Sequence, residues 1–293
     1  MRIRATACAI GTAVAAALVL PASAWADTPR PAVESPPKAL TVLGLTSDQR
    51  LVEFRTDGPA RTTDRGRVSG LTADREIVGI DFRVQDKKLY GVGDRGGIYV
   101  LDQGTAKAER VSQLSVQLAG DAFGVDFNPA ADRLRVVSDT GQNLRHNLGD
   151  PAAPKTTTTD AALTNPAASS ATPQPTPAKG VTGAAYTNND LSSTTATTLF
   201  DLDTGKARVS VQSPANAGTL APTGILGAAA GPSAGFDIYF SPETKTNHGF
   251  ASVQTGNSYR FQSVDLLSGT ATNAGSFPAS AQVFDIALPL DQG

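Results

Sequence analysis

The chain has 293 residues, of which 40% are hydrophobic, 18% charged and 6% aromatic. Its 25 basic and 27 acidic residues nearly balance, which excludes the unopposed basic surface that nucleic-acid binding needs. The single cysteine, Cys8, excludes internal disulfides, and beyond residue 8 it also excludes thiolate metal sites and cysteine nucleophiles.

The first 26 residues have the pattern of a secretory signal peptide. Arg2 and Arg4 precede an apolar run that reaches Leu20, and Ala-Trp-Ala at 24–26 offers a cleavage site between small residues. The apolar run is shorter than the roughly 20 residues that span a bilayer, so the mature chain is expected to have no transmembrane segment. We therefore expect a secreted protein, either extracellular or associated with the cell wall.

Two later segments have the composition of linkers. Residues 27–39 are rich in proline and are predicted to form a tether. Residues 151–179 consist mostly of threonine, alanine, proline and serine, which predicts a surface insertion with at most one short strand, near 156–163. The remainder of 40–290 is predicted to be one domain.

A four-residue motif recurs along this domain. It reads Gly-Ile-Asp-Phe at 79–82, Gly-Val-Asp-Phe at 124–127, Gly-Phe-Asp-Ile at 235–238 and Val-Phe-Asp-Ile at 283–286. A strand-sized motif that returns in this way indicates an array of one β unit.

The motifs divide the domain into sets of short β-rich runs separated by glycine, asparagine and aspartate. No window has the apolar stripe and caps of a helix, so the fold class is predicted to be all-β. In chain order, the predicted strands are 40–45, 51–56 and 61–68; 78–83, 88–92, 97–101 and 108–114; 124–128, 133–138, 142–148 and a weak strand in the threonine tract; a strand from 181, then 198–202, 207–212 and 220–226; a strand from 235, then 249–253, 259–265 and 270–277; and 283–288.

The two ends of the domain do not make complete units by themselves. Three strands at the amino end and one at the carboxyl end together give a fifth unit of four. A circular array closed by its C-terminal strand would have this pattern, whereas an open solenoid would need capping repeats. We therefore predict a five-bladed β-propeller in which the C-terminal strand joins the N-terminal blade, with six blades as the alternative if the insertion hides another.

A long motif in the third unit resembles a bacterial family. Residues 120–138 read Gly-x-x-Phe-Gly-Val-Asp-Phe-Asn-Pro-x-x-Asp-Arg-Leu-Arg-Val-Val-Ser, and 140–145 read Thr-Gly-Gln-Asn-Leu-Arg. Together with shorter motifs elsewhere, they resemble the family known as domain of unknown function 4394 over nearly all of 40–288. The resemblance implies a secreted or cell-surface, propeller-like domain without an established activity.

The repeated aspartates are the first candidate site. A circular array would bring Asp81, Asp126, Asp237 and Asp285 near one axis, where they could bind calcium, the one cofactor that the sequence suggests. The alternative is that each carboxylate hydrogen-bonds the backbone of a neighbouring blade. Tyr186 interrupts the carboxylate ring in the fourth unit, which argues against a symmetric metal site.

The polar segment 128–145 is the second candidate. Its arginines could recognise a carboxylate or sugar hydroxyls, and the alternative is a salt-bridge network between blades. The predicted ligand-binding residues are Asn128, Arg133, Arg135, Asn143 and Arg145.

No convergent catalytic set is evident, because His146 and His248 are not spaced as metal ligands and no nucleophile-elbow motif occurs. We therefore expect a monomeric binding module at the cell surface, rather than an enzyme, whose ligand is a small molecule, a glycan or a protein. The alternative is a calcium-dependent hydrolase, similar to lactonase propellers, that acts at the central channel. A purely adhesive surface module is a third hypothesis.

Overall fold

The structure is a computed structural model that describes residues 38–150, 155–168, 174–192 and 194–292. The predicted signal peptide and all but the last two residues of the predicted tether lie outside these ranges. Regular structure in the described part is almost entirely β-strand, with one short 3-10 helix, η1 (Ala215–Ala217). The described part contains no helix with the length and apolarity needed to cross a membrane.

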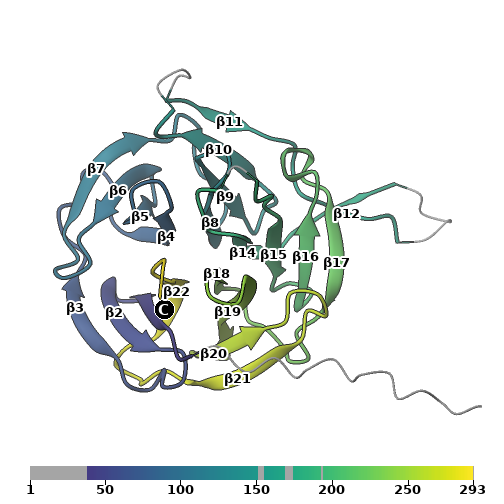
Figure 1. The fold of residues 1–293 in the computed structure, drawn as a ribbon. Coiled ribbons are helices and arrows are strands. Elements are labelled where there is room, and N and C mark those ends of the chain that lie inside the picture. The colour runs from purple at the N-terminus through teal and green to yellow at the C-terminus, as the bar shows by residue number, and fades with distance from the viewer. Residues whose placement is uncertain (1–37, 151–154, 169–173, 193, 293) are drawn as a thin grey trace, which may run out of the picture. The chain divides into compact units, whose positions relative to one another are not determined.

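Five four-stranded antiparallel sheets surround a common axis as the blades of a propeller (Figure 1). From the innermost strand outward, blade 1 is β22 (Val283–Ala287), β1 (Thr41–Thr46), β2 (Arg50–Arg55) and β3 (Thr63–Arg67); blade 2 is β4 (Ile77–Arg83), β5 (Lys88–Gly93), β6 (Gly97–Leu101) and β7 (Ala108–Gln113); blade 3 is β8 (Phe123–Asn128), β9 (Arg133–Ser138), β10 (Asn143–Asn147) and β11 (Thr157–Thr159); blade 4 is β14 (Val181–Tyr186), β15 (Leu199–Asp203), β16 (Arg208–Gln212) and β17 (Leu220–Ile225); blade 5 is β18 (Ala234–Ser241), β19 (Thr246–Thr255), β20 (Ser258–Val264) and β21 (Ala271–Ser276).

The C-terminal strand closes the ring. Strand β22 pairs antiparallel with β1, placing Leu45 opposite Asp285 and Leu43 opposite Ala287. The last strand of the chain is thus the innermost strand of the first blade. The prediction of a five-bladed propeller closed in this way is confirmed, and the six-bladed alternative is wrong.

The insertion does not hide a blade, but it has more structure than predicted. It supplies β11 to blade 3, and it also forms a separate two-stranded sheet from β12 (Thr164–Asn165) and β13 (Thr176–Pro177). The prediction of at most one strand is therefore wrong. The hairpin forms because of contacts distant in sequence: Leu163 and Ala178 bracket it and are buried between blades 3 and 4, which anchors both ends of the segment.

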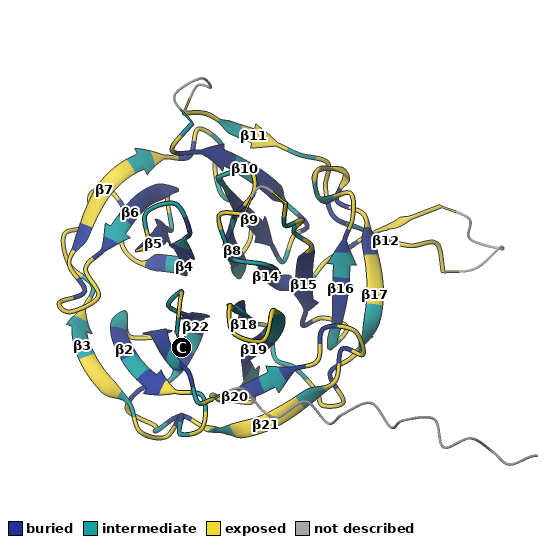
Figure 2. Ribbon diagram, viewed as in Figure 1, coloured by how far each residue is buried: buried dark blue, intermediate teal, exposed yellow. Residues whose placement is uncertain are grey.

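Apolar clusters fill the five seams between neighbouring blades, and each cluster draws residues from two blades. In the seam between blades 1 and 5, Phe54 meets Phe261 and Phe277 edge to face, with ring centroids 5.0 and 5.1 Å apart. The innermost strands are buried on both faces, while most residues of the outermost strands are exposed or partly exposed (Figure 2). This packing fixes the innermost strands, which carry the candidate site.

Candidate functional site

The four predicted aspartates, which we call the axial aspartates, all lie on innermost strands and are buried. Asp81, Asp126, Asp237 and Asp285 are only 2–6% exposed. Glycine begins the motif of Asp81, Asp126 and Asp237 and lets these strands approach their neighbours closely. A Cβ at Gly124 would lie 2.5 Å from the backbone nitrogen of Ala184, in the next blade. The recurring Gly-x-Asp pattern therefore encodes a close approach as well as a carboxylate.

Each axial aspartate accepts a hydrogen bond from the backbone of the next blade. The amide of Ile80 donates to Asp285 at 2.7 Å, that of Phe127 to Asp81 at 2.8 Å, and that of Leu288 to Asp237 at 2.6 Å. Asp126 accepts the amide of Tyr186. These bonds link blades 5, 1, 2, 3 and 4 in order, as the structural alternative for these residues predicted.

The break in the ring is at Ala185, which corrects the assignment to Tyr186. Asp81 is bonded by Phe127, the residue that follows Asp126, and Asp126 is bonded in the same way by Tyr186, the residue that follows Ala185. Alanine thus occupies the carboxylate position, so blade 4 cannot make this link to blade 5.

Asparagines on the loop after β14 link blades 4 and 5 instead. The amide of Asn188 donates to Asn247 Oδ1 at 2.8 Å, and Asn189 Nδ2 donates to the carbonyl oxygen of Ile238 at 3.0 Å. Blades 4 and 5 are therefore joined without an axial carboxylate.

Three of the axial aspartates form a tight cluster. Asp81, Asp126 and Asp237 each present an oxygen, and these oxygens lie within 4.8 Å of one another. Burial raises the pKa of all four axial carboxyls, that of Asp237 to about 6, and repulsion from Asp237 and Asp285 further raises the pKa of Asp81.

No lysine or arginine in the described part of the chain forms an ion pair with an axial aspartate. Asp126 Oδ1, although buried, has no hydrogen-bond partner there. No basic side chain among the described residues therefore offsets the charge of these carboxylates when they are ionised.

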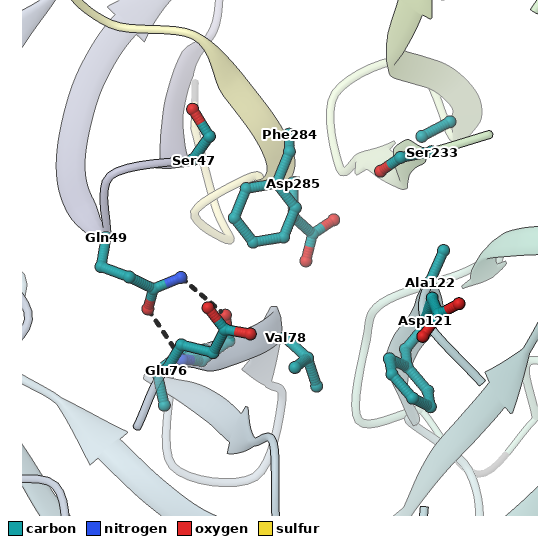
Figure 3. Close-up of a pocket in the computed structure, with 12 residues that line it drawn as sticks. Ser47, Gln49, Glu76, Val78, Asp121, Ala122, Ser233, Phe284 and Asp285 are labelled. Carbon is teal, nitrogen blue, oxygen red and sulfur yellow. Dashed lines mark hydrogen bonds between the residues drawn. The ribbon is translucent and has the colours of Figure 1, made fainter. Parts of the chain in front are cut away.

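A pocket of about 190 Å³, which we call the axial pocket, lies where the innermost strands of blades 2, 3 and 5 begin (Figure 3). Its carboxylates are Glu76, Asp121 and Asp285, and neither lysine nor arginine lines it. Gln49 is fixed in the wall by two hydrogen bonds with the backbone of Ile77, at 3.1 and 2.7 Å. The full lining is Ser47, Gln49, Glu76, Ile77, Val78, Asp121, Ala122, Phe123, Ser233, Ala234, Phe284 and Asp285.

Sequence reasoning missed most of these lining residues, although a signal for them existed. Glu76 and Asp121 each stand three residues before the glycine of a motif, and Ser233 stands two residues before another. A position just before an innermost strand places each of these side chains at the same end of the axis. The signal for these three residues lies in the segments that precede the motif.

The predicted ligand-binding segment is largely engaged in internal contacts. Arg135, whose side chain is 2% exposed, donates to Asp160, Asn143 and Asn216 at 2.6–2.8 Å, and Arg145 donates to the same Asp160. Arg135 and Asn143 are buried in the seam between blades 3 and 4, where they cannot form a ligand rim.

The side chain of Asn128 reaches the same cluster through Tyr186, whose hydroxyl also accepts a hydrogen bond from Arg135 Nε at 3.3 Å. Arg133 pairs with Asp150 at 2.9 Å, and Asn128 Oδ1 accepts the amides of Ala130 and Ala131 in a turn. The contacts of the segment match the salt-bridge alternative. A ligand role for the partly exposed Asn128, Arg133 and Arg145 stays a prediction.

A second hollow, of about 390 Å³, lies on blade 2 alone and is lined by both acidic and basic side chains, among them Lys88, Lys107, Asp102 and Glu109. Although larger than the axial pocket, it gathers residues from one sheet only. Convergence of several blades therefore favours the axial pocket as the candidate site.

Comparison with known proteins gives a family but no activity. A family model described as "Domain of unknown function (DUF4394)" matches residues 50–287. No curated protein matches the sequence.

Similar solved structures include hydrazine synthase from Kuenenia stuttgartiensis (12% identity, TM-score 0.40, 71% of this chain and 52% of that chain). A protein from Lactobacillus plantarum (18%, 0.40, 81% and 67%) and a protein of unknown function from Bacteroides thetaiotaomicron (12%, 0.46, 85% and 64%) are also similar. This chain thus spans about half to two thirds of the length of these structures. At such low similarity they carry no conclusion about function.

Proposed function

This chain belongs to the family described as a domain of unknown function (DUF4394), and from the geometry at its axis we propose that it is a binding module that takes a small, positively charged ligand in the axial pocket. The observation that carries the proposal is a wall contributed by four blades whose only charged side chains are carboxylates. Such a wall attracts cations and repels anions.

The shape and the apolar part of the pocket narrow the ligand class. At about 190 Å³ the pocket is smaller than the roughly 300–1,000 Å³ of sites for drug-sized molecules, so the ligand is a small one. Phe123 and Phe284 line the pocket together with the carboxylates, and an aromatic face within about 6 Å attracts an ammonium group. A small amine, including an amino sugar, fits both features.

Binding can be tested with ligands of matched size that differ in charge. Glucosamine and glucose have the same ring, but glucosamine carries an ammonium group where glucose has a hydroxyl. We expect glucosamine, choline or spermidine to raise the melting temperature of the protein and glucose to leave it unchanged.

A matched pair of variants locates the effect. Glu76→Gln removes an exposed carboxylate of the axial pocket, whereas Glu109→Gln removes one from the hollow on the outside of the same blade. Loss of the shift in Glu76→Gln but not in Glu109→Gln supports the proposal. Equal shifts from the charged and neutral sugars would contradict it.

The alternative, a calcium-dependent hydrolase at the centre of the propeller, is favoured by one observation, the clustering of Asp81, Asp126 and Asp237. The test is turnover of lactone and ester substrates with calcium present and after chelation. Turnover that calcium restores and Asp126→Asn abolishes would favour the enzyme over the binding module.

We also propose that the protein is exported and acts outside the cell. The support is the sequence pattern of residues 1–26. Mass spectrometry of the protein recovered from the culture medium tests this, with an amino terminus at Asp27 as the expected result. An intact Met1 in protein that stays in the cytoplasm would refute it.

A further inference from the structure

Of the four axial aspartates, only Asp285 lines the axial pocket, and the other three form a separate, buried chemical environment. We infer that Asp81, Asp126 and Asp237 bind one divalent cation of calcium's size, which neutralises the axis and joins blades 2, 3 and 5. This inference goes beyond the binding of an amine in the pocket and does not depend on it.

The separations of the three carboxylates fit one ion. Calcium binds oxygen at about 2.3–2.6 Å, so two ligands on opposite sides of it are up to about 5 Å apart. Oxygens of the three aspartates all lie within 4.8 Å of one another. Magnesium binds at about 2.0–2.1 Å and would need every pair within about 4.2 Å. At the upper limit of 4.8 Å, a central ion would lie about 2.8 Å from each oxygen, so calcium binds after shifts of a few tenths of an ångström and magnesium needs larger ones.

The hydrogen bonds leave coordination capacity inside the cluster. Asp81 Oδ2 is held by the amide of Phe127, and both oxygens of Asp237 are held by the amides of Ile238 and Leu288, so these carboxylates are oriented before any ion arrives. Asp126 Oδ1, by contrast, is buried and has no partner among the described residues. An unsatisfied buried carboxylate oxygen is costly, and a cation would satisfy it.

The charge of the axis leads to the same conclusion. Three carboxylates this close, with Asp285 nearby, cannot all be ionised without a counter-charge, and the arginines of the polar segment and of β4 are paired elsewhere. Either protons or a metal ion must neutralise them. The two possibilities predict different responses to calcium and to pH.

The axial pocket lies beside the cluster. Asp285 lines the pocket, and its charge also acts on Asp81 and Asp126. Glu76 and Asp121 add negative charge to the pocket wall, which attracts a cation from solvent towards this end of the axis.

Calorimetric titration of calcium chloride alone into chelator-treated protein tests the inference. We expect one calcium per chain and a higher melting temperature in its presence. Asp126→Asn keeps an oxygen for the amide of Tyr186 but removes the charge, and it should weaken calcium binding at least about tenfold. Asp57→Asn, which removes an exposed carboxylate paired loosely with Arg55, should bind calcium as the unmodified protein does.

The remaining outcomes are equally decisive. No calcium binding by the unmodified protein, or unchanged affinity in Asp126→Asn, overturns the inference. If Asp126→Asn does not fold, the pH series of the unmodified protein decides, because a cation that displaces protons from these carboxyls must bind more weakly at pH 5 than at pH 8. Affinity independent of pH would then overturn it. Glu76→Gln separates the two proposals, since it should weaken amine binding and leave the calcium stoichiometry at one.

Discussion

Asp160→Asn is the change that tests most sharply whether the polar segment of blade 3 is structural. The side chain of Asp160 is only 5% exposed, and it accepts hydrogen bonds from both Arg135 and Arg145 at 2.7–3.0 Å. Burial tends to raise the pKa of Asp160, but these two arginines hold it below its ordinary value. The substitution leaves the buried Arg135 without an ionised partner.

The expected cost follows from that burial. Removing one partner of a buried ion pair costs about 3–5 kcal/mol, whereas a surface pair is worth about 0–1 kcal/mol. The control is Asp150→Asn, which makes the same chemical change to the partner of Arg133 in the same blade, where the side chains are 20% and 36% exposed.

Thermal denaturation followed by circular dichroism measures both losses. For a domain of this size, we expect Asp160→Asn to lower the melting temperature by about 6–20 °C and Asp150→Asn by no more than about 4 °C. Similar small losses in both variants would refute the structural interpretation of the segment and return it to the ligand-rim hypothesis.

Three further predictions concern the axis and the seams. Gly124→Ala should lower the free energy of unfolding by about 1–3 kcal/mol or more, because its Cβ would lie 2.5 Å from the backbone of blade 4. In the control Gly104→Ala, the nearest atom to the added Cβ is 3.5 Å away, and the melting temperature should be nearly unchanged. In the presence of chelator, the axial carboxyls should make the protein less stable to unfolding as pH rises from about 4 through 6, since they keep protons in the folded state that the unfolded chain releases. Asp126→Asn should make the stability depend less on pH. The same dependence in the variant and the unmodified protein would count against the raised pKa values. Burial lowers the pKa of His146, which lies between Ser112 and Thr157, to about 4. As pH falls from about 6.5 to 4, the unfolded chain therefore binds a proton at this histidine before the folded protein does, and His146 makes the protein less stable. His146→Gln should remove this contribution in urea titrations at each pH, and an unchanged pH dependence would contradict the lowered pKa of His146.

The fold was predictable because its signals are local and repeated. The Gly-x-Asp-Phe motif fixed the phase of the innermost strands, and the three strands before Gly79 together with the single strand after Val283 revealed the closure. The small sheet at 164–177 was missed because its stability comes from Leu163 and Ala178, whose burial depends on a neighbouring blade. The composition of residues 151–179 does not show that Leu163 and Ala178 are buried against another blade.

The candidate site was predictable only in part, because the sequence does not give the register between blades. The repeated motif correctly predicted that the axial aspartates lie on innermost strands. The prediction of Arg135 and Asn143 on a ligand rim was wrong, because alternation along a strand shows which residues share a face and not whether that face is buried. The substitution at Ala185 is readable from the sequence, because Gly-Ala-Ala-Tyr at 183–186 aligns with Gly-Val-Asp-Phe at 124–127. The hydrogen bonds confirm this alignment, since Tyr186 bonds Asp126 as Phe127 bonds Asp81.

The central claim is that the axial aspartates both join the blades and hold a cation. Anomalous diffraction from crystals grown with manganese as a calcium substitute tests it most directly. The account predicts one strong peak on the axis, about 2.1–2.6 Å from carboxylate oxygens of Asp81, Asp126 and Asp237. Carboxyl oxygens about 2.5–2.7 Å apart that share protons, with no peak between them, would contradict it.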